Sequence, residues 1–157
     1  MNRELLDIYE DGGRKLAKAI EHLDRNDLIA VPIPGKWSIQ QLVVHLADSD
    51  LVIADRMKRV LAEDKPSLLA FDENKWVERL HYELQSAQDA VALLALNRRC
   101  MTAVLRILPD KAFKRTGIHS ERGEMSLEKL LNGAISHLDH HLKFLYEKRE
   151  KLGKIMW

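Results

Sequence analysis

The sequence is poor in several features that would each define a class of protein. Its single cysteine, Cys100, excludes an intrachain disulfide and agrees with a reducing compartment. It contains no run of about eighteen apolar residues, so it predicts no membrane-spanning helix. The net charge is only +1, which provides no basic stripe to attract nucleic acid or an anionic membrane. The first residues lack the apolar core of a secretion signal, and we therefore expect a cytoplasmic protein.

Helix-breaking residues are also scarce, with four prolines and seven glycines among 157 residues. Apolar residues recur at steps of three and four, which predicts four long helices, over about 3–26, 39–63, 86–108 and 127–151. Within the first, Gly12 and Gly13 either let another backbone approach or weaken the helix by about 1 kcal/mol each. Ser38 with Gln41, and Ser126 later in the chain, are the caps expected to start the second and fourth helices.

The connections between these helices predict their arrangement. About twenty residues, 64–84, separate the second helix from the third and include a short helical segment, DENKWVERL. A crossover of this length allows the second and third helices to run parallel, so we expect an all-α, four-helix bundle with up-down-down-up order. The stretch FKRTGIHSERGEMS predicts a small β-like hairpin before the last helix. The length predicts a single domain over residues 1–157.

Histidines on the second and fourth helices are the main candidates for chemistry. His137 and His141 are four residues apart, so their imidazoles lie on one helix face and can reach one metal ion. His45 flanks the apolar stripe of the second helix and can complete a three-nitrogen site with an open position. His140 falls outside the stripe, toward solvent. The alternative is that these are ordinary surface or hydrogen-bonded histidines, because seven histidines will produce such spacings by chance.

Three polar residues near these helices have two interpretations each. Asp48 is a weak candidate for a catalytic base or for an acceptor that orients the His45 ring; the alternative is a solvated acid. Asn97 is placed near the middle of the third helix's apolar stripe, where it either lines a substrate cavity or is a hydrogen-bonded core amide. Arg98 either meets an anionic substrate group or forms a surface salt bridge, and we expect the salt bridge.

Aromatic residues and the cysteine outside the helix stripes are less informative. Trp76 in the crossover either walls a substrate pocket or plugs one end of the bundle. Trp37, just before the second helix, is expected to be such a plug. Cys100 has no basic neighbour on its helix face and is expected to be a small buried residue rather than a nucleophile.

The stretches PGKWSIQQLVVHLADSD and FDENKWVERL resemble the entry into the second helix and the crossover of the DinB superfamily, especially of its YfiT-like branch. FKRTGIHSERGEMSLEKLL followed by AISHLDHHLKFL resembles its hairpin and last helix. The resemblance covers about residues 30–150, in the family's order and spacing. One departure is the segment GAISH, where the branch carries aromatic residues before the first histidine; this indicates a wider site or a different substrate.

The resemblance implies a bundle of the order given above and a divalent metal held by His45, His137 and His141. It also implies a homodimer. The superfamily includes thiol-S-transferases that use bacillithiol or mycothiol, a mycothiol-dependent isomerase, and many members described as metal-dependent hydrolases. Imidazole ligands suit zinc and nickel alike.

The sequence therefore predicts a divalent-metal-dependent enzyme acting on a small molecule. As a Lewis acid, the metal can activate either a water for hydrolysis or a low-molecular-weight thiol for transfer. The alternative is a helical bundle that binds a metal or a partner without catalysis, in which the pocket beside the histidines would be filled by side chains.

Overall fold

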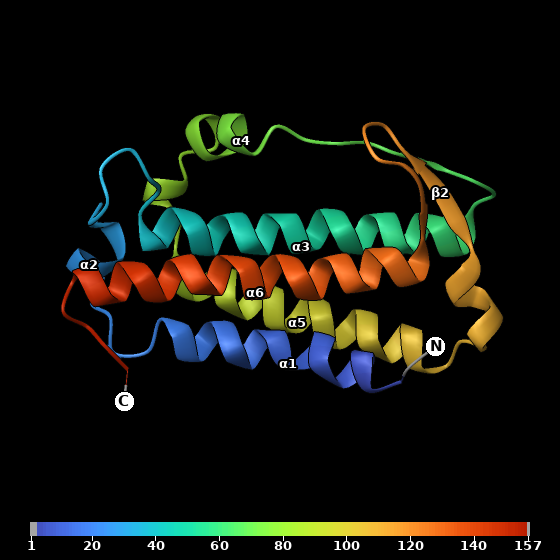
Figure 1. Ribbon diagram of the computed structural model, residues 1–157, viewed down its shortest axis with the longest axis horizontal. Helices are drawn as coiled ribbons and strands as arrows, with labels where there is room; N and C mark the ends of the chain where they lie inside the picture. Colours follow the sequence, from blue (N-terminus) through green and yellow to red (C-terminus); the bar gives the residue numbers. More distant parts are fainter. Residues whose placement is uncertain (1–2, 157) are drawn as a thin grey trace.

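Four long helices packed lengthwise form the body of the computed structural model, which describes residues 3–156 (Figure 1). They are α1 (Glu4–Ala19), α3 (Ile39–Ala62), α5 (Ala87–Arg106) and α6 (Leu127–Lys151). Helix α1 packs against α5 and α6, and α3 packs against the same two helices. Figure 1 shows α3 and α5 running in one direction and α1 and α6 in the other. The up-down-down-up four-helix bundle is thus confirmed.

The expected first helix is too long by about seven residues. Helix α1 ends at Ala19, and a separate short helix, α2 (Arg25–Ile29), follows. Between them, His22 has a φ of 62°, a left-handed conformation that cannot continue an α-helix. Asp24 then starts α2: its carboxylate accepts from the Asp27 N–H at 2.9 Å, and its own N–H donates to the Asp27 carboxylate at 3.1 Å. The apolar spacing continues across this break, so it could not reveal the break by itself.

The crossover and the hairpin are joined by a small sheet that the sequence did not predict in full. The hairpin strands β2 and β3 pair antiparallel, as expected, and a short strand of the crossover, β1, pairs in parallel with β2. Figure 1 shows the crossover running along the outer side of α3, from this sheet to α4. The connecting elements are β1 (Ser67–Leu68), α4 (Glu73–Arg79), η1 (Tyr82–Leu84), η2 (Asp110–Lys114), β2 (Thr116–His119) and β3 (Gly123–Ser126).

The predicted caps are confirmed, and of the two interpretations of Gly12 and Gly13 the structure shows a close approach of another helix at Gly13. The Ser38 hydroxyl accepts from the Gln41 N–H in a reciprocal capping box, and the Ser126 hydroxyl accepts from the Lys129 N–H. Gly13 faces α5 so closely that a Cβ there would lie 2.7 Å from the Cα of Ala95. Glycine at this position therefore sets the distance between α1 and α5.

In residues 3–156, no helix is both long enough and apolar enough to cross a lipid bilayer.

A buried ion pair lies at the centre of the bundle, which corrects the expectation for Arg98. The Arg98 Nε donates to an Asp50 carboxylate oxygen at 2.8 Å, and the two side chains are only 3% and 2% exposed. The same guanidinium donates to the carbonyls of Tyr9 and Ala134, so it links four helices. Burial raises the pKa of the Asp50 carboxyl, although Arg98 and Asn97 both act to lower it. This is a core interaction and not a surface salt bridge.

The buried face of α5 runs through Arg98 rather than Asn97. The amide of Asn97 is half-buried and donates to the carboxylate of Asp50 at 2.7 Å and to its carbonyl at 3.2 Å. Asn97 is thus a hydrogen-bonded amide beside the core, one of the two interpretations open from the sequence. Cys100 is exposed, so the expectation of a buried cysteine is wrong. The residues buried on α5 are Ala87, Ala90, Leu94, Arg98, Met101, Thr102 and Leu105.

Candidate metal centre

Three histidines from two helices converge beside the crossover. His45 comes from α3 and is buried, whereas His137 and His141 come from successive turns of α6 and are half-buried. One ring nitrogen of each lies within 4.8 Å of the corresponding nitrogens of the other two. Nε2 of His45 lies 3.3 Å from Nε2 of His137. Among the residues described, this is the one group of three or more histidine, cysteine, aspartate or glutamate side chains close enough to share a metal ion.

Burial keeps these imidazoles neutral, which is the protonation state that binds metals. Burial, together with the neighbouring rings of His141 and His137, lowers the pKa of His45 to about 3. Burial is also the main cause of the lowered pKa values of His137 and His141, both about 4. All three rings are therefore neutral at physiological pH, and a neutral imidazole has a nitrogen lone pair to offer a cation.

The surroundings of the rings fit a bound cation. Nδ1 of His141 is buried and has no hydrogen-bond partner among the residues described, an arrangement that costs free energy until the ring gains a ligand. The Ser49 hydroxyl lies 3.4 Å from Nδ1 of His45, and the Trp37 ring packs 5.0 Å from the His45 ring between centroids. The chemistry of the donor set, three neutral nitrogens, matches a divalent transition metal rather than calcium or magnesium.

An acidic side chain from the crossover also reaches this group. Oε2 of Glu73, in the first turn of α4, lies 3.5 Å from Nε2 of His45. The Glu73 side chain is 51% exposed, so it faces solvent on one side and the histidines on the other. Sequence reasoning missed this residue because only the folding of the crossover back along α3 brings α4 to the histidines. In the sequence, Glu73 is marked only by its place at the start of the short helix α4, directly after Asp72, which caps that helix.

A cavity of about 530 Å³ opens beside the histidines. Its volume is in the range of small-molecule sites, about 300–1,000 Å³. The crossover, the hairpin, α3 and α6 all contribute to its wall. Residues that line it include Ser49, Arg56, Phe71, Glu73, His119, Arg122, Gly133, His137, His140 and His141.

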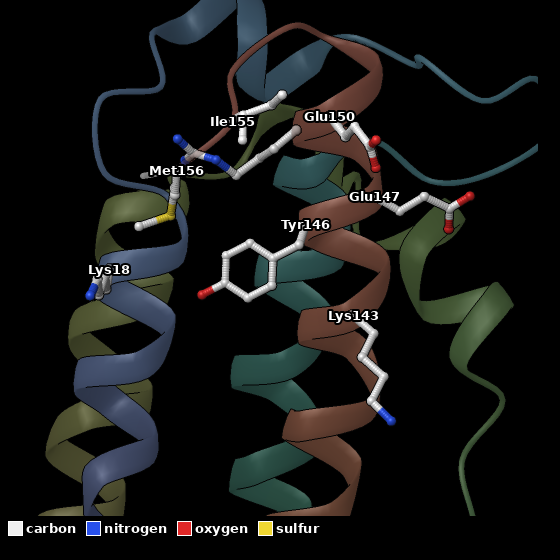
Figure 2. Close-up of a pocket in the computed structure, with 8 residues that line it drawn as sticks. Lys18, Lys143, Tyr146, Glu147, Glu150, Ile155 and Met156 are labelled. Carbon is white, nitrogen blue, oxygen red and sulfur yellow. The ribbon is translucent and has the colours of Figure 1, made fainter.

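Two other hollows help to define the site by contrast. A larger one, of about 770 Å³, lies between α1 and the last turns of α6, where Lys18, Tyr146 and Met156 line it (Figure 2). It contains none of the three histidines, so its size does not make it the candidate centre. A smaller one, of about 340 Å³, lies on another side of His141 and is lined by Trp37 among others.

The other residues singled out from the sequence lie around the histidines but not among them. Asp48 accepts a hydrogen bond from the hydroxyl of Tyr82, and no hydrogen bond joins it to His45 within residues 3–156. The Trp76 ring packs against Phe71, 4.6 Å between centroids, so that Phe71 rather than Trp76 lines the cavity. Asn97 is held at Asp50 and is also absent from the cavity wall.

Comparison with known proteins gives consistent matches over most of the chain. The family model of the DinB superfamily matches residues 8–145. The chain is 31% identical over 149 residues to a protein of Bacillus subtilis (strain 168) named "Putative metal-dependent hydrolase YfiT", a match that covers 94% of this chain and 84% of YfiT. A relative from Oceanobacillus iheyensis named "Putative metal-dependent hydrolase OB0413" is 29% identical over 139 residues, covering 88% of this chain and 80% of the relative.

Solved structures give the same result for the fold. The structure of YfiT from Bacillus subtilis, described as a four-helix bundle of unusual topology, superposes with a TM-score of 0.89 at 30% identity. That match covers 96% of this chain and 86% of YfiT. The mycothiol-dependent maleylpyruvate isomerase superposes with a TM-score of 0.71 at 14% identity, over 90% of this chain and 59% of the isomerase, a likeness that shows the fold alone.

Proposed function

Because the chain belongs to the DinB superfamily and gathers three neutral imidazoles beside a cavity, we propose that it is a divalent-metal-dependent enzyme acting on a small molecule. His45, His137 and His141 would hold the metal, and zinc and nickel both suit such ligands. The observation that carries the proposal is the convergence of the three ring nitrogens within 4.8 Å of one another. The names of the relatives, metal-dependent hydrolases, support it.

Hydrolysis is the reaction that the chain's own residues favour. A bound divalent metal supplies a Lewis acid that lowers the pKa of a water or a thiol. Glu73, with a carboxylate oxygen 3.5 Å from Nε2 of His45, is placed to accept a proton from a nucleophile at the histidines. It takes the role of base that the sequence assigned weakly to Asp48, whose carboxylate is already engaged by Tyr82.

Thiol transfer is the second route through the same site, and it requires a thiol from outside the chain. Cys100 is exposed on α5 and does not line the cavity. A low-molecular-weight thiol would therefore be a cosubstrate. The non-catalytic alternative expects side chains to fill the space beside the histidines, and the open volume of about 530 Å³ argues against it.

The two routes are separated by assaying metal-loaded protein with and without added thiol. One arm uses a panel of small esters and amides; the other uses a halobimane with bacillithiol, mycothiol or cysteine. Hydrolysis without any thiol supports the first route, and thiol-dependent loss of the halobimane supports the second. Failure of every arm with metal-loaded protein contradicts an enzyme acting on these substrate classes.

Two variants of α4 test the role of Glu73. Glu73→Gln removes the carboxylate beside His45, and we expect kcat to fall by about 10²–10⁴ fold while metal content is retained. Glu78→Gln removes an exposed acid from the same helix and should leave kcat unchanged. Equal rates for the two variants would remove Glu73 from the mechanism.

The homodimer and the cytoplasmic location expected from the sequence stay predictions.

A further inference from the structure

Three nitrogen-bearing side chains share the wall of the cavity with His137 and His141 of the candidate metal centre. Arg56 comes from α3, His119 from the end of β2, and Arg122 from the turn that follows β2. The pairing of β1 with β2 and of β2 with β3 ties the hairpin to the crossover at this point. The fold therefore holds two arginines and a histidine on the same small volume as His137 and His141.

The donors of the two arginines are mostly unused by the protein. One Arg56 Nη donates to the Leu69 carbonyl at 2.5 Å, but its Nε is buried without a partner. The guanidinium of Arg122 makes no hydrogen bond or ion pair within residues 3–156, and it lines the cavity. Glu121 also lines the cavity, yet it forms no ion pair with either arginine in that part of the chain. Since an arginine offers five N–H donors, most of this capacity remains available to a ligand.

His119 adds a donor of defined orientation. Its Nδ1 accepts the backbone N–H groups of Glu121 and Arg122, at 3.2 and 3.3 Å. A neutral imidazole that accepts at Nδ1 carries its proton on Nε2, so this second nitrogen is a donor. The His119 side chain is buried and its pKa is lowered by burial and by the charges of Arg56 and Arg122. The ring is therefore a neutral N–H donor near physiological pH.

Arg56 and Arg122 both line this cavity, and their like charges repel each other. Burial first, and then the charge of Arg122, lower the pKa of Arg56, whereas Asp55 and Glu121 act in the opposite direction. An oxyanion accepts from several N–H donors at once and offsets that repulsion. The planar guanidinium group of arginine can donate two parallel hydrogen bonds to the oxygens of a carboxylate or a phosphate.

We propose that Arg56, His119 and Arg122 form an oxyanion subsite, which binds a carboxylate or phosphate group of the small-molecule substrate while the rest of that molecule extends toward the histidines. The part concerning the substrate rests on the function proposed above; the binding of an oxyanion by these three side chains does not. The subsite defines the substrate class as anionic small molecules that fit a cavity of about 530 Å³.

The test is an NMR titration of metal-free protein with inorganic phosphate and, separately, with acetate. Metal-free protein is used so that no ion can be bound through a metal. We expect saturable shifts of the Arg56 and Arg122 side-chain signals with at least one of the two ions, which also shows whether phosphate or carboxylate is preferred. Arg122→Gln should weaken that binding by about tenfold or more, since a hydrogen bond to a charged group is typically worth about 1.5–3 kcal/mol.

Matched variants make the result interpretable. Arg99→Gln removes the same charge from an exposed position of α5 and should leave the dissociation constant within about twofold. Arg122 is exposed, so its replacement should not prevent folding, whereas Arg56→Gln serves as the second variant with its melting temperature measured alongside. Absence of saturable binding, or equal weakening by Arg99→Gln, would overturn the subsite. Saturable binding by a protein that never takes up metal would keep the subsite and refute the metal-dependent function.

Discussion

Arg98→Met is expected to be one of the most damaging single changes in the bundle outside the candidate metal centre. It leaves the Asp50 carboxylate, 2% exposed, without its ion-pair partner at 2.8 Å. Removing one member of a buried pair typically costs about 3–5 kcal/mol. For a domain of this size, a loss of that magnitude corresponds to about 6 to 20 °C in melting temperature. Asn97 still donates to the stranded carboxylate, so we expect the lower half of this range.

The assay is urea denaturation followed by circular dichroism, at pH 7 and with metal-free protein. Arg106→Met is the matched control, because Arg106 lies on the same helix and pairs with Asp7 at the surface, where such a pair contributes about 0–1 kcal/mol. The double variant Asp50→Leu with Arg98→Met replaces both charges by apolar groups. It should be more stable than Arg98→Met alone, since no unpaired charge remains buried. A loss below about 1 kcal/mol for Arg98→Met, or a double variant that loses the sum of both single losses, would mean that Arg98 and Asp50 do not stabilise the bundle as a pair.

Two further predictions concern stability. Gly13→Ala should lower the free energy of unfolding by about 1–3 kcal/mol, because the added Cβ would lie 2.7 Å from Ala95. Gly133→Ala should raise it by about 0.5–1 kcal/mol, because nothing lies within 4 Å of the Cβ added there. Chemical denaturation that ranks the two variants the other way would contradict the packing of α1 on α5. Lowering the pH should destabilise the metal-free protein, because His137, with a native pKa of about 4, binds fewer protons than it does unfolded, where its pKa is about 6.5. The free energy of unfolding should therefore fall between about pH 6.5 and 4, by at most about 1.4 kcal/mol per pH unit for each such histidine, and His137→Gln should flatten that dependence.

The main helices could be predicted from the sequence because their signals are local. Apolar spacing, the Ser38 capping box and the length of the crossover were enough to give the bundle and its order. The break after Ala19 was missed, since the apolar residues of α1 and α2 continue one pattern through a left-handed turn at His22. Strand β1 was missed as well, because two residues carry no periodicity and depend on a partner strand 51 positions away.

The candidate site was likewise predicted where the sequence signal is local and missed where it depends on the fold. His45, His137 and His141 could be proposed because their helices and spacing indicated one shared face, and the structure brings the three rings together. Glu73 could not be found, because it depends on how the crossover folds back onto α3. Arg98 was placed at the surface because a charged residue is usually solvated. Its burial depends on a partner 48 positions away, Asp50, that a helix pattern cannot reveal.

Elemental analysis of protein purified without a histidine tag tests whether the three histidines hold a metal. We predict a stoichiometric divalent metal in the wild-type chain and its loss in His141→Ala, whose ring is one of the three that converge. His140→Ala removes the exposed neighbouring imidazole and should retain the metal. Circular dichroism of each variant shows whether the bundle has folded. A wild-type chain without stoichiometric metal after incubation with zinc or nickel, or equal metal content in a folded His141→Ala variant, would contradict the account.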